Sequence, residues 1–81
     1  MTYQQQIIKT YEASGYLVLK TIRLNKNGYP DLFCFKDGKT IFIEVKESND
    51  TLKPLQKLRI DELKKLGFDA HCTQKDKGII Y

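Results

Sequence analysis

The fold is decided by the stretch GYPDLFCFKDGKTIFIEVK, residues 28–46. Within it, two runs rich in aromatic and β-branched residues flank the dipeptide Asp37-Gly38. An Asp-Gly pair between such runs is the strongest short-range signal of a β-hairpin with a two-residue loop. We therefore predict an antiparallel hairpin with strands over 31–36 and 39–46.

The register of this hairpin brings two carboxylates together. Counting outward from the turn, Leu32 faces Ile43, and one step further Asp31 faces Glu44. Directly opposed residues hold their Cβ atoms about 4.5–5.5 Å apart, a distance at which like charges destabilise a sheet. A Mg²⁺ or Mn²⁺ ion between the carboxylates relieves that repulsion, because hard cations prefer oxygen ligands. The alternative is an exposed sheet end at which both charges meet water.

Three further residues belong to the predicted site. The backbone carbonyl of Val45 lies beside Glu44 and can add a metal ligand. Side-chain alternation places Lys46 on the same face as Glu44, where it can orient an attacking water or balance charge on a phosphate. On the helix expected next in the chain, Gln56 falls within the apolar arc and should point toward the sheet.

The flanking segments predict a small α/β domain. The capping-box spacing of Thr2 and Gln5 begins a first helix that ends at Gly15, and a strand over 16–24 follows. A second helix is expected from Pro54 to Leu66, then a strand over 69–73 and a turn or mobile tail over 75–78. Because both faces of the hairpin are largely apolar, we expect a mixed sheet with helices packed on both faces, in the order αβββαβ.

Composition narrows the class of protein. A chain of 81 residues allows one domain with a thin core, spanning residues 1–81. Its 14 Lys and Arg residues against 10 Asp and Glu residues give a net charge of +4, which favours an anionic partner weakly. No apolar run approaches about 20 residues and no signal peptide is evident, so we expect a cytoplasmic protein without membrane contact. Cys34 and Cys72 fit neither a disulfide framework nor zinc-site spacing.

The same residues carry a family resemblance. The pairing of GYPD, residues 28–31, with EVK, residues 44–46, resembles the PD-(D/E)xK nuclease signature. With LKPLQ (52–56) and LKKLGF (63–68) added, the pattern is similar to a stand-alone VRR-NUC domain, over residues 15–68. The resemblance implies a restriction-endonuclease-like fold and Mg²⁺- or Mn²⁺-dependent DNA hydrolysis. It also implies the following roles: Asp31, Glu44 and the Val45 carbonyl as metal ligands, Lys46 as the catalytic lysine, and Gln56 as a supporting residue.

One position departs from the family pattern. Relatives commonly carry an acidic residue early in the first helix, where this chain has Gln4, Gln5 and Gln6. The one acidic residue of this helix is Glu12, near its C-terminal end. Either a glutamine supplies an oxygen instead, or Glu12 reaches the site, or this ligand is missing. The number of metal ions therefore stays open.

The resemblance and the small core together predict a homodimer that cleaves branched DNA, with Holliday junction resolution as the first expectation and a phage-type origin. The alternatives are a less selective nickase or flap nuclease, and a catalytically impaired DNA-binding module. Basic residues around the site are expected to contact phosphates, unless they form only a solvated face. They are Lys20, Arg23, Lys26, Lys53 and Lys57.

Overall fold

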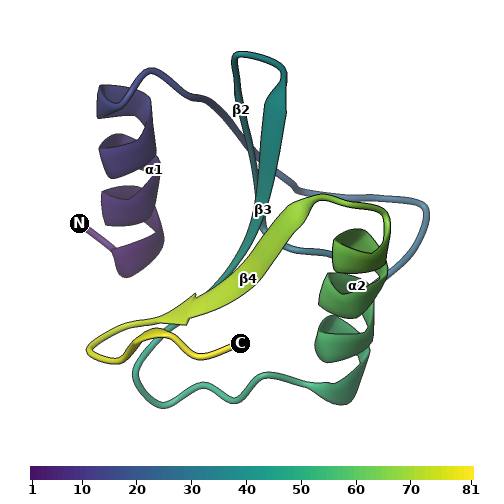
Figure 1. The fold of residues 1–81 in the computed structure, drawn as a ribbon. Helices are drawn as coiled ribbons and strands as arrows, with labels where there is room; N and C mark the ends of the chain where they lie inside the picture. Colours follow the sequence, from purple (N-terminus) through teal and green to yellow (C-terminus); the bar gives the residue numbers. More distant parts are fainter.

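The computed structural model describes residues 1–81, which form two helices and a five-stranded mixed sheet (Figure 1). The strands lie in the order β1-β2-β3-β4-β5, and β3 and β4 are the one parallel pair. The predicted order αβββαβ is confirmed, with a short strand added at the end. The elements are α1 (Tyr3–Ala13), β1 (Leu17–Lys20), β2 (Leu32–Lys36), β3 (Lys39–Lys46), α2 (Pro54–Lys65), β4 (Asp69–Gln74) and β5 (Gly78–Ile79).

The central hairpin has the predicted turn and register. Asp37 and Gly38 have φ angles of 50° and 76°, so both loop residues occupy the left-handed region that a two-residue hairpin turn requires. Lys36 pairs with Lys39, and the ladder continues to the pair of Leu32 with Ile43. The turn chemistry alone therefore set which side chains share a face of β2 and β3.

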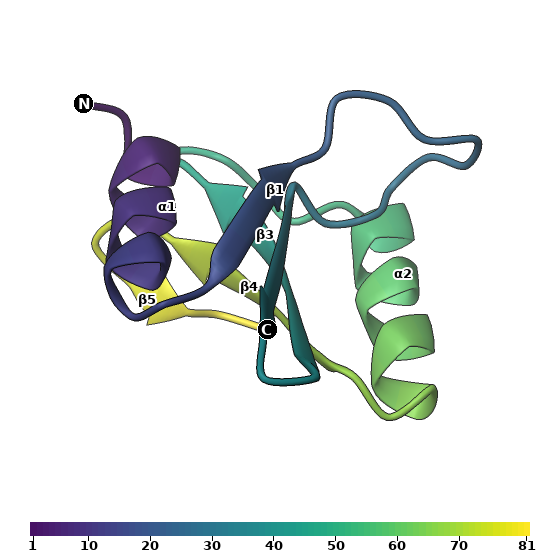
Figure 2. The same ribbon diagram turned by 90° about the horizontal axis from the view of Figure 1, so that it is seen from above.

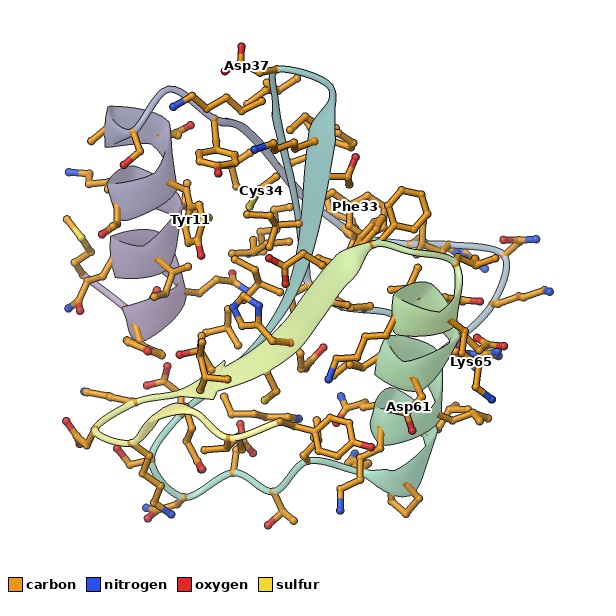
Figure 3. All side chains as sticks on the ribbon, viewed as in Figure 1. Tyr11, Phe33, Cys34, Asp37, Asp61 and Lys65 are labelled. Atoms are coloured by element: carbon orange, nitrogen blue, oxygen red, sulfur yellow. The ribbon has the colours of Figure 1, made fainter.

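Alternation along the strands divides the apolar residues into two cores on opposite faces of the sheet. Leu32, Cys34 and Ile43 form one core, with side chains of α1 packed against it. Phe42, Ala70 and Cys72 belong to the other core, together with residues of α2. The two helices lie on opposite sides of the sheet (Figures 1 and 2). Figure 3 shows the alternation directly, with Cys34 on the side of Tyr11 in α1 and Phe33 on the side of α2. The expectation of helices on both faces is confirmed.

The first strand is shorter than predicted. The expected strand over 16–24 is wrong beyond Lys20, because β1 pairs only with β2 and that partner ends nearby. The backbone N–H of Thr21 still donates to the carbonyl of Asp31 at 2.8 Å, but no further backbone hydrogen bond joins the two segments, because the contacts of Asn27 and Gly28 hold that part of the chain on α2. Residues 21–31 consequently leave the sheet as a long connection.

The C-terminal segment is more ordered than predicted. Strand β4 continues one residue past the expected end, to Gln74, and a turn leads into β5, which pairs antiparallel with β4. The N–H of Ile80 then donates to the carbonyl of Cys72 at 2.9 Å. Of the two predicted alternatives the turn is confirmed, over residues 75–77, and the strand that follows it satisfies backbone groups that the edge of β4 would otherwise leave unpaired.

The longer helix, α2, has 12 residues, and neither helix is long and apolar enough to cross a membrane.

Candidate active site

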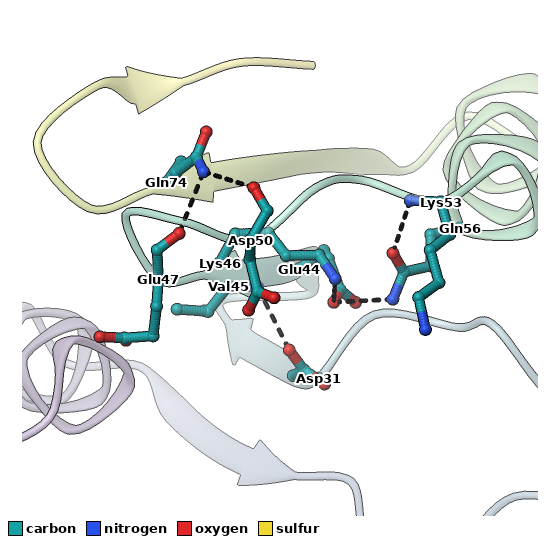
Figure 4. Close-up of polar contacts among 9 residues, drawn as sticks. All are labelled: Asp31, Glu44, Val45, Lys46, Glu47, Asp50, Lys53, Gln56 and Gln74. Atoms are coloured by element: carbon teal, nitrogen blue, oxygen red, sulfur yellow. Dashed lines mark hydrogen bonds and ion pairs between the residues drawn. The ribbon is translucent and has the colours of Figure 1, made fainter.

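The predicted site residues meet at the C-terminal end of β3. Asp31 lies one residue before β2, and its Oδ2 accepts a hydrogen bond from the N–H of Val45 at 3.2 Å. The Nζ of Lys46 lies 3.6 Å from Oε2 of Glu44, and Nε2 of Gln56 donates to the same oxygen at 3.2 Å. Figure 4 shows these side chains converging from β3, α2 and the residue before β2.

Glu44 is the most constrained of these residues. It is only 3% exposed, on the face of the sheet covered by α2. Burial, and then the negative charge of Asp31, raise the pKa of its carboxyl to about 7 from an ordinary 4.5, although Lys46 pulls the pKa the other way. Its Oε2 has two partners, but Oε1 is buried without any hydrogen-bond partner in the chain. A buried oxygen with no partner is costly and points to a ligand that the chain itself does not supply.

Gln56 connects the start of α2 to this carboxylate. It occupies the first turn of the helix, and its Oε1 accepts the N–H of Lys53 at 2.9 Å. Because the oxygen is used there, the amide must present Nε2 to Glu44, as observed. The prediction that Gln56 points toward the sheet is confirmed, and the contact orients one oxygen of Glu44 while leaving the other free.

The donor set fits a hard divalent cation. Asp31 and Glu44 supply two carboxylates, and no group of three or more His, Cys, Asp or Glu side chains gathers anywhere in the chain. The carbonyl of Val45 leaves β3 on the same strand edge as its N–H, which is the edge facing Asp31. Two carboxylates completed by a carbonyl, water and phosphate oxygens suit Mg²⁺ or Mn²⁺ better than Zn²⁺, which prefers His and Cys. The unpartnered Oε1 of Glu44 supports this fit.

The connection between β3 and α2 is held by a residue that the sequence did not single out. Gln74 is 4% exposed, and its Nε2 donates to the carbonyls of Glu47, Ser48 and Asp50 at 3.0, 3.3 and 2.7 Å. Figure 4 shows this amide on the far side of Lys46 from Asp31. Gln74 thus fixes the backbone that leaves Lys46. The one available signal was a glutamine directly after the expected strand over 69–73, and it is a weak signal.

A second fixed element borders the site. Arg59 donates from Nε to the carbonyl of Asn27 at 3.0 Å, pairs with Glu62 at 3.0 Å and lies 4.8 Å from the centre of the Tyr29 ring. Gly28, at φ +86°, packs so closely on α2 that a Cβ there would lie 2.7 Å from Leu55 Cγ. The connection over residues 21–29 is therefore clamped to α2. It lines a hollow of about 560 Å³ that Asp31 also lines.

The five basic residues proposed for phosphate contact are all exposed, but they lie in three places. Arg23 and Lys26 line the hollow that contains Asp31. Lys53 and Lys57 lie at the start of α2, and the ammonium group of Lys57 is 5.9 Å from the ring centre of Tyr81. Lys20 is the last residue of β1. Arg23 and Lys26 thus share a hollow with a carboxylate of the site, and Lys53 is joined to the site by its backbone N–H, which donates to Gln56.

The first helix does not bring an acid to the site. Glu12 is exposed and lines a hollow with Lys9 and Met1, with no hydrogen bond or ion pair to Asp31 or Glu44. Gln5 is used by the capping box with Thr2. Among the early glutamines, Gln4 is half-buried, whereas Gln5 and Gln6 are exposed. The possibility that Glu12 reaches the carboxylate pair is not supported by this geometry.

The other candidate side chains lie apart from the carboxylates. His71 pairs with Ile43 across the sheet, which places it on the α1 face, and its Nδ1 is 3.7 Å from Asp69. Burial raises the pKa of the Cys34 and Cys72 thiols to about 11, so both stay protonated near neutral pH.

Comparison with known proteins agrees with this geometry. The VRR-NUC domain family matches residues 2–75. A solved structure described as a VRR_NUC domain superposes with a TM-score of 0.74 at 30% identity, over 85% of this chain and 76% of that chain. The structure of Hjc from Archaeoglobus fulgidus, a Holliday junction resolvase, gives a TM-score of 0.67 at 15% identity, over 88% of this chain and 65% of that chain. No curated protein matches.

Proposed function

The chain belongs to the VRR-NUC domain family, and from that premise we propose that it is a metal-dependent DNA endonuclease whose site is formed by Asp31, Glu44, Lys46 and Gln56. The observation that carries the proposal is Oε1 of Glu44, which is buried without a partner beside a second carboxylate. A structural residue in that position would be matched by a donor of the chain. A ligand-binding residue needs a free oxygen.

Each residue has a distinct part in the proposed reaction. Asp31, Glu44 and the carbonyl of Val45 would hold Mg²⁺ or Mn²⁺. A divalent cation bound there supplies Lewis-acid chemistry to a phosphodiester and its attacking water. Lys46 is held by Glu44 at 3.6 Å, so its ammonium group is positioned to orient the nucleophile or to offset the negative charge that grows on the phosphate. Gln56 keeps the carboxylate of Glu44 turned so that Oε1 stays free.

The proposed substrate is branched DNA, cut by a homodimer. Hjc is a Holliday junction resolvase, and its similarity in fold to this chain supports the choice of a four-way junction. The edge strand β1 supports a second copy, because Leu17 and Leu19 are 61% and 47% exposed beside Phe35 and Phe33 of β2. A dimer with two-fold symmetry has two active sites, which suits a pair of cuts in a four-way junction. Sedimentation at several concentrations tests the dimer separately from the chemistry.

Cleavage assays test the activity. Purified protein is incubated with labelled duplex, flap and four-way-junction DNA in Mg²⁺, Mn²⁺ or EDTA. We expect cleavage with metal only, and a loss of about a hundredfold or more in Lys46→Met. The matched control is Lys39→Met, which removes an exposed lysine about 23 Å away along the same strand. No cleavage of any substrate with either metal would exclude the nuclease, and full activity of Asp31→Asn would exclude the assigned site.

A catalytically impaired DNA-binding module is the second candidate. The observation in its favour is the exposed position of Glu12, which leaves α1 without an acid near the carboxylate pair. This candidate predicts salt-dependent DNA binding without cleavage, together with Mn²⁺ binding that Glu44→Gln weakens in calorimetric titration.

A further inference from the structure

The most exposed large apolar side chain of the protein lies beside the candidate site. Ile22 is 95% exposed, in the connection between β1 and β2. Leu24, two residues on, is 41% exposed and lines a second hollow with Phe33, Phe42 and Leu63. Ile22 belongs to neither hydrophobic core and lines the hollow of about 560 Å³ that Asp31 also lines.

The segment that carries Ile22 is held in place at both ends. At its start, Oγ1 of Thr21 donates to the carbonyls of Pro30 and Asp31 at 3.2 and 3.1 Å. At its end, Arg59 of α2 binds the carbonyl of Asn27, and Gly28 packs against α2. Figure 2 shows the segment, in blue, projecting from the sheet toward the start of α2. Ile22 is therefore exposed to solvent on a loop whose two ends are fixed by hydrogen bonds and packing.

The surroundings of Ile22 indicate what it contacts. Arg23 and Lys26 line the same hollow, and neither forms an ion pair within the chain. A partner for this surface must offer negative charge for the cations and an apolar face for the isoleucine. Nucleic acid offers both when a base step is unstacked, because phosphates flank the apolar faces of the bases. In an intact duplex those faces are covered by stacking, whereas a branch point interrupts the stack.

We propose that Ile22 is a specificity-determining residue that inserts against the open base step at a DNA branch point, while Arg23 and Lys26 contact the flanking phosphates. This inference rests on the proposed nuclease function and adds the means by which branched DNA is selected. The hollow that Ile22 shares with Asp31 places the contacted base step within the same surface as the cleavage site.

The test compares Ile22→Ser and Ile22→Phe with wild type on a four-way junction and on a duplex of the same arm sequence. We expect Ile22→Ser to lower the junction-to-duplex cleavage ratio about tenfold, and Ile22→Phe to retain it, because a larger apolar side chain still fills the step. Leu66→Ser is the matched control. It removes a side chain that is 72% exposed at the opposite end of α2, about 18 Å along the helix, and the ratio should stay unchanged.

A second readout does not depend on catalysis. In EDTA, 2-aminopurine placed at the branch point should brighten further when wild type binds, because the inserted side chain keeps the step open, and should brighten less with Ile22→Ser. An unchanged ratio and an equal 2-aminopurine signal in Ile22→Ser overturn the inference, as does a change of oligomeric state, which would assign Ile22 to a contact between copies. If wild type brightens the probe but cuts nothing with Mn²⁺, the nuclease proposal fails while the base contact stands.

Discussion

The buried carboxylate of Glu44 makes the stability of the metal-free protein depend on pH in a specific way. The perturbation is to raise the pH from 5 to 8 in EDTA, with Glu44→Gln as the reference variant. The pKa of Glu44 is raised to about 7 in the folded protein, whereas 4.5 is its ordinary value. The folded state therefore binds this proton more tightly than the unfolded state does. Its contribution to stability is fully present below about pH 4.5 and is lost as the pH rises toward 7.

The size of the effect follows from the two values. The interval between 4.5 and about 7 corresponds to about 3 kcal/mol, at about 1.4 kcal/mol for each pH unit. Most of this loss falls between pH 5 and pH 8. Because Glu44→Gln has no proton to lose there, its free energy of unfolding minus that of wild type should grow by about 2–3 kcal/mol across this range. Titrating groups that do not interact with Glu44 are common to both proteins and cancel in the difference.

Urea denaturation at a series of pH values measures this difference. Addition of Mn²⁺ at pH 8 should restore wild-type stability, by about 3 kcal/mol at one hundred times the dissociation constant, and should leave Glu44→Gln nearly unchanged. A difference that stays within 1 kcal/mol from pH 5 to pH 8 would refute the reasoning. It would mean that Glu44 is hydrated or fully compensated by Lys46, and that its free oxygen carries no cost.

Three other perturbations test the surroundings of the site. Gln74→Ala removes the donor to three carbonyls of the β3–α2 connection, so the free energy of unfolding measured in urea should fall by about 2 kcal/mol. A fall below about 0.5 kcal/mol, the usual scatter for surface substitutions, would contradict the role of Gln74. Gly28→Ala places a Cβ 2.7 Å from Leu55 at a positive φ, so the free energy of unfolding should fall by about 1–3 kcal/mol in thermal unfolding. An unchanged midpoint temperature would show that the connection is not fixed to α2. The double change of Arg23 and Lys26 to Ala should reduce the slope of log affinity for DNA against log salt by about 2, whereas an equal slope would exclude both phosphate contacts.

Local chemistry accounts for the parts of the protein that were predictable. The turn at Asp37 and Gly38 depends on two residues and their φ angles, so the hairpin register could be counted from it. Once the register was known, the nearness of Asp31 to Glu44 and the side taken by Lys46 followed from alternation. The helix boundaries were equally local, because the cap at Thr2 and the proline at residue 54 act within one turn.

The errors occurred where a strand's end depends on its neighbour. Residues 21–24 continue the alternating pattern of a strand, but the segment that would pair with them is held on α2 through Asn27 and Gly28. For that reason Ile22 lies in a connection instead of a strand. Strand β5 was not predicted, because its two residues are too few to show the alternation of a strand. They form a strand only because they pair with β4.

The sequence by itself determined the hairpin, the side on which the two carboxylates and the lysine lie, and the family to which the chain belongs. Only the tertiary structure decided that Glu44 is buried with one oxygen unmatched, that Gln56 holds its other oxygen, and that Gln74 and Arg59 hold the connections on either side. The physical reason is separation along the chain. Alternation and turn geometry act over a few residues, whereas these contacts join residues 12 to 32 positions apart, and they exist only once the sheet and α2 have packed together.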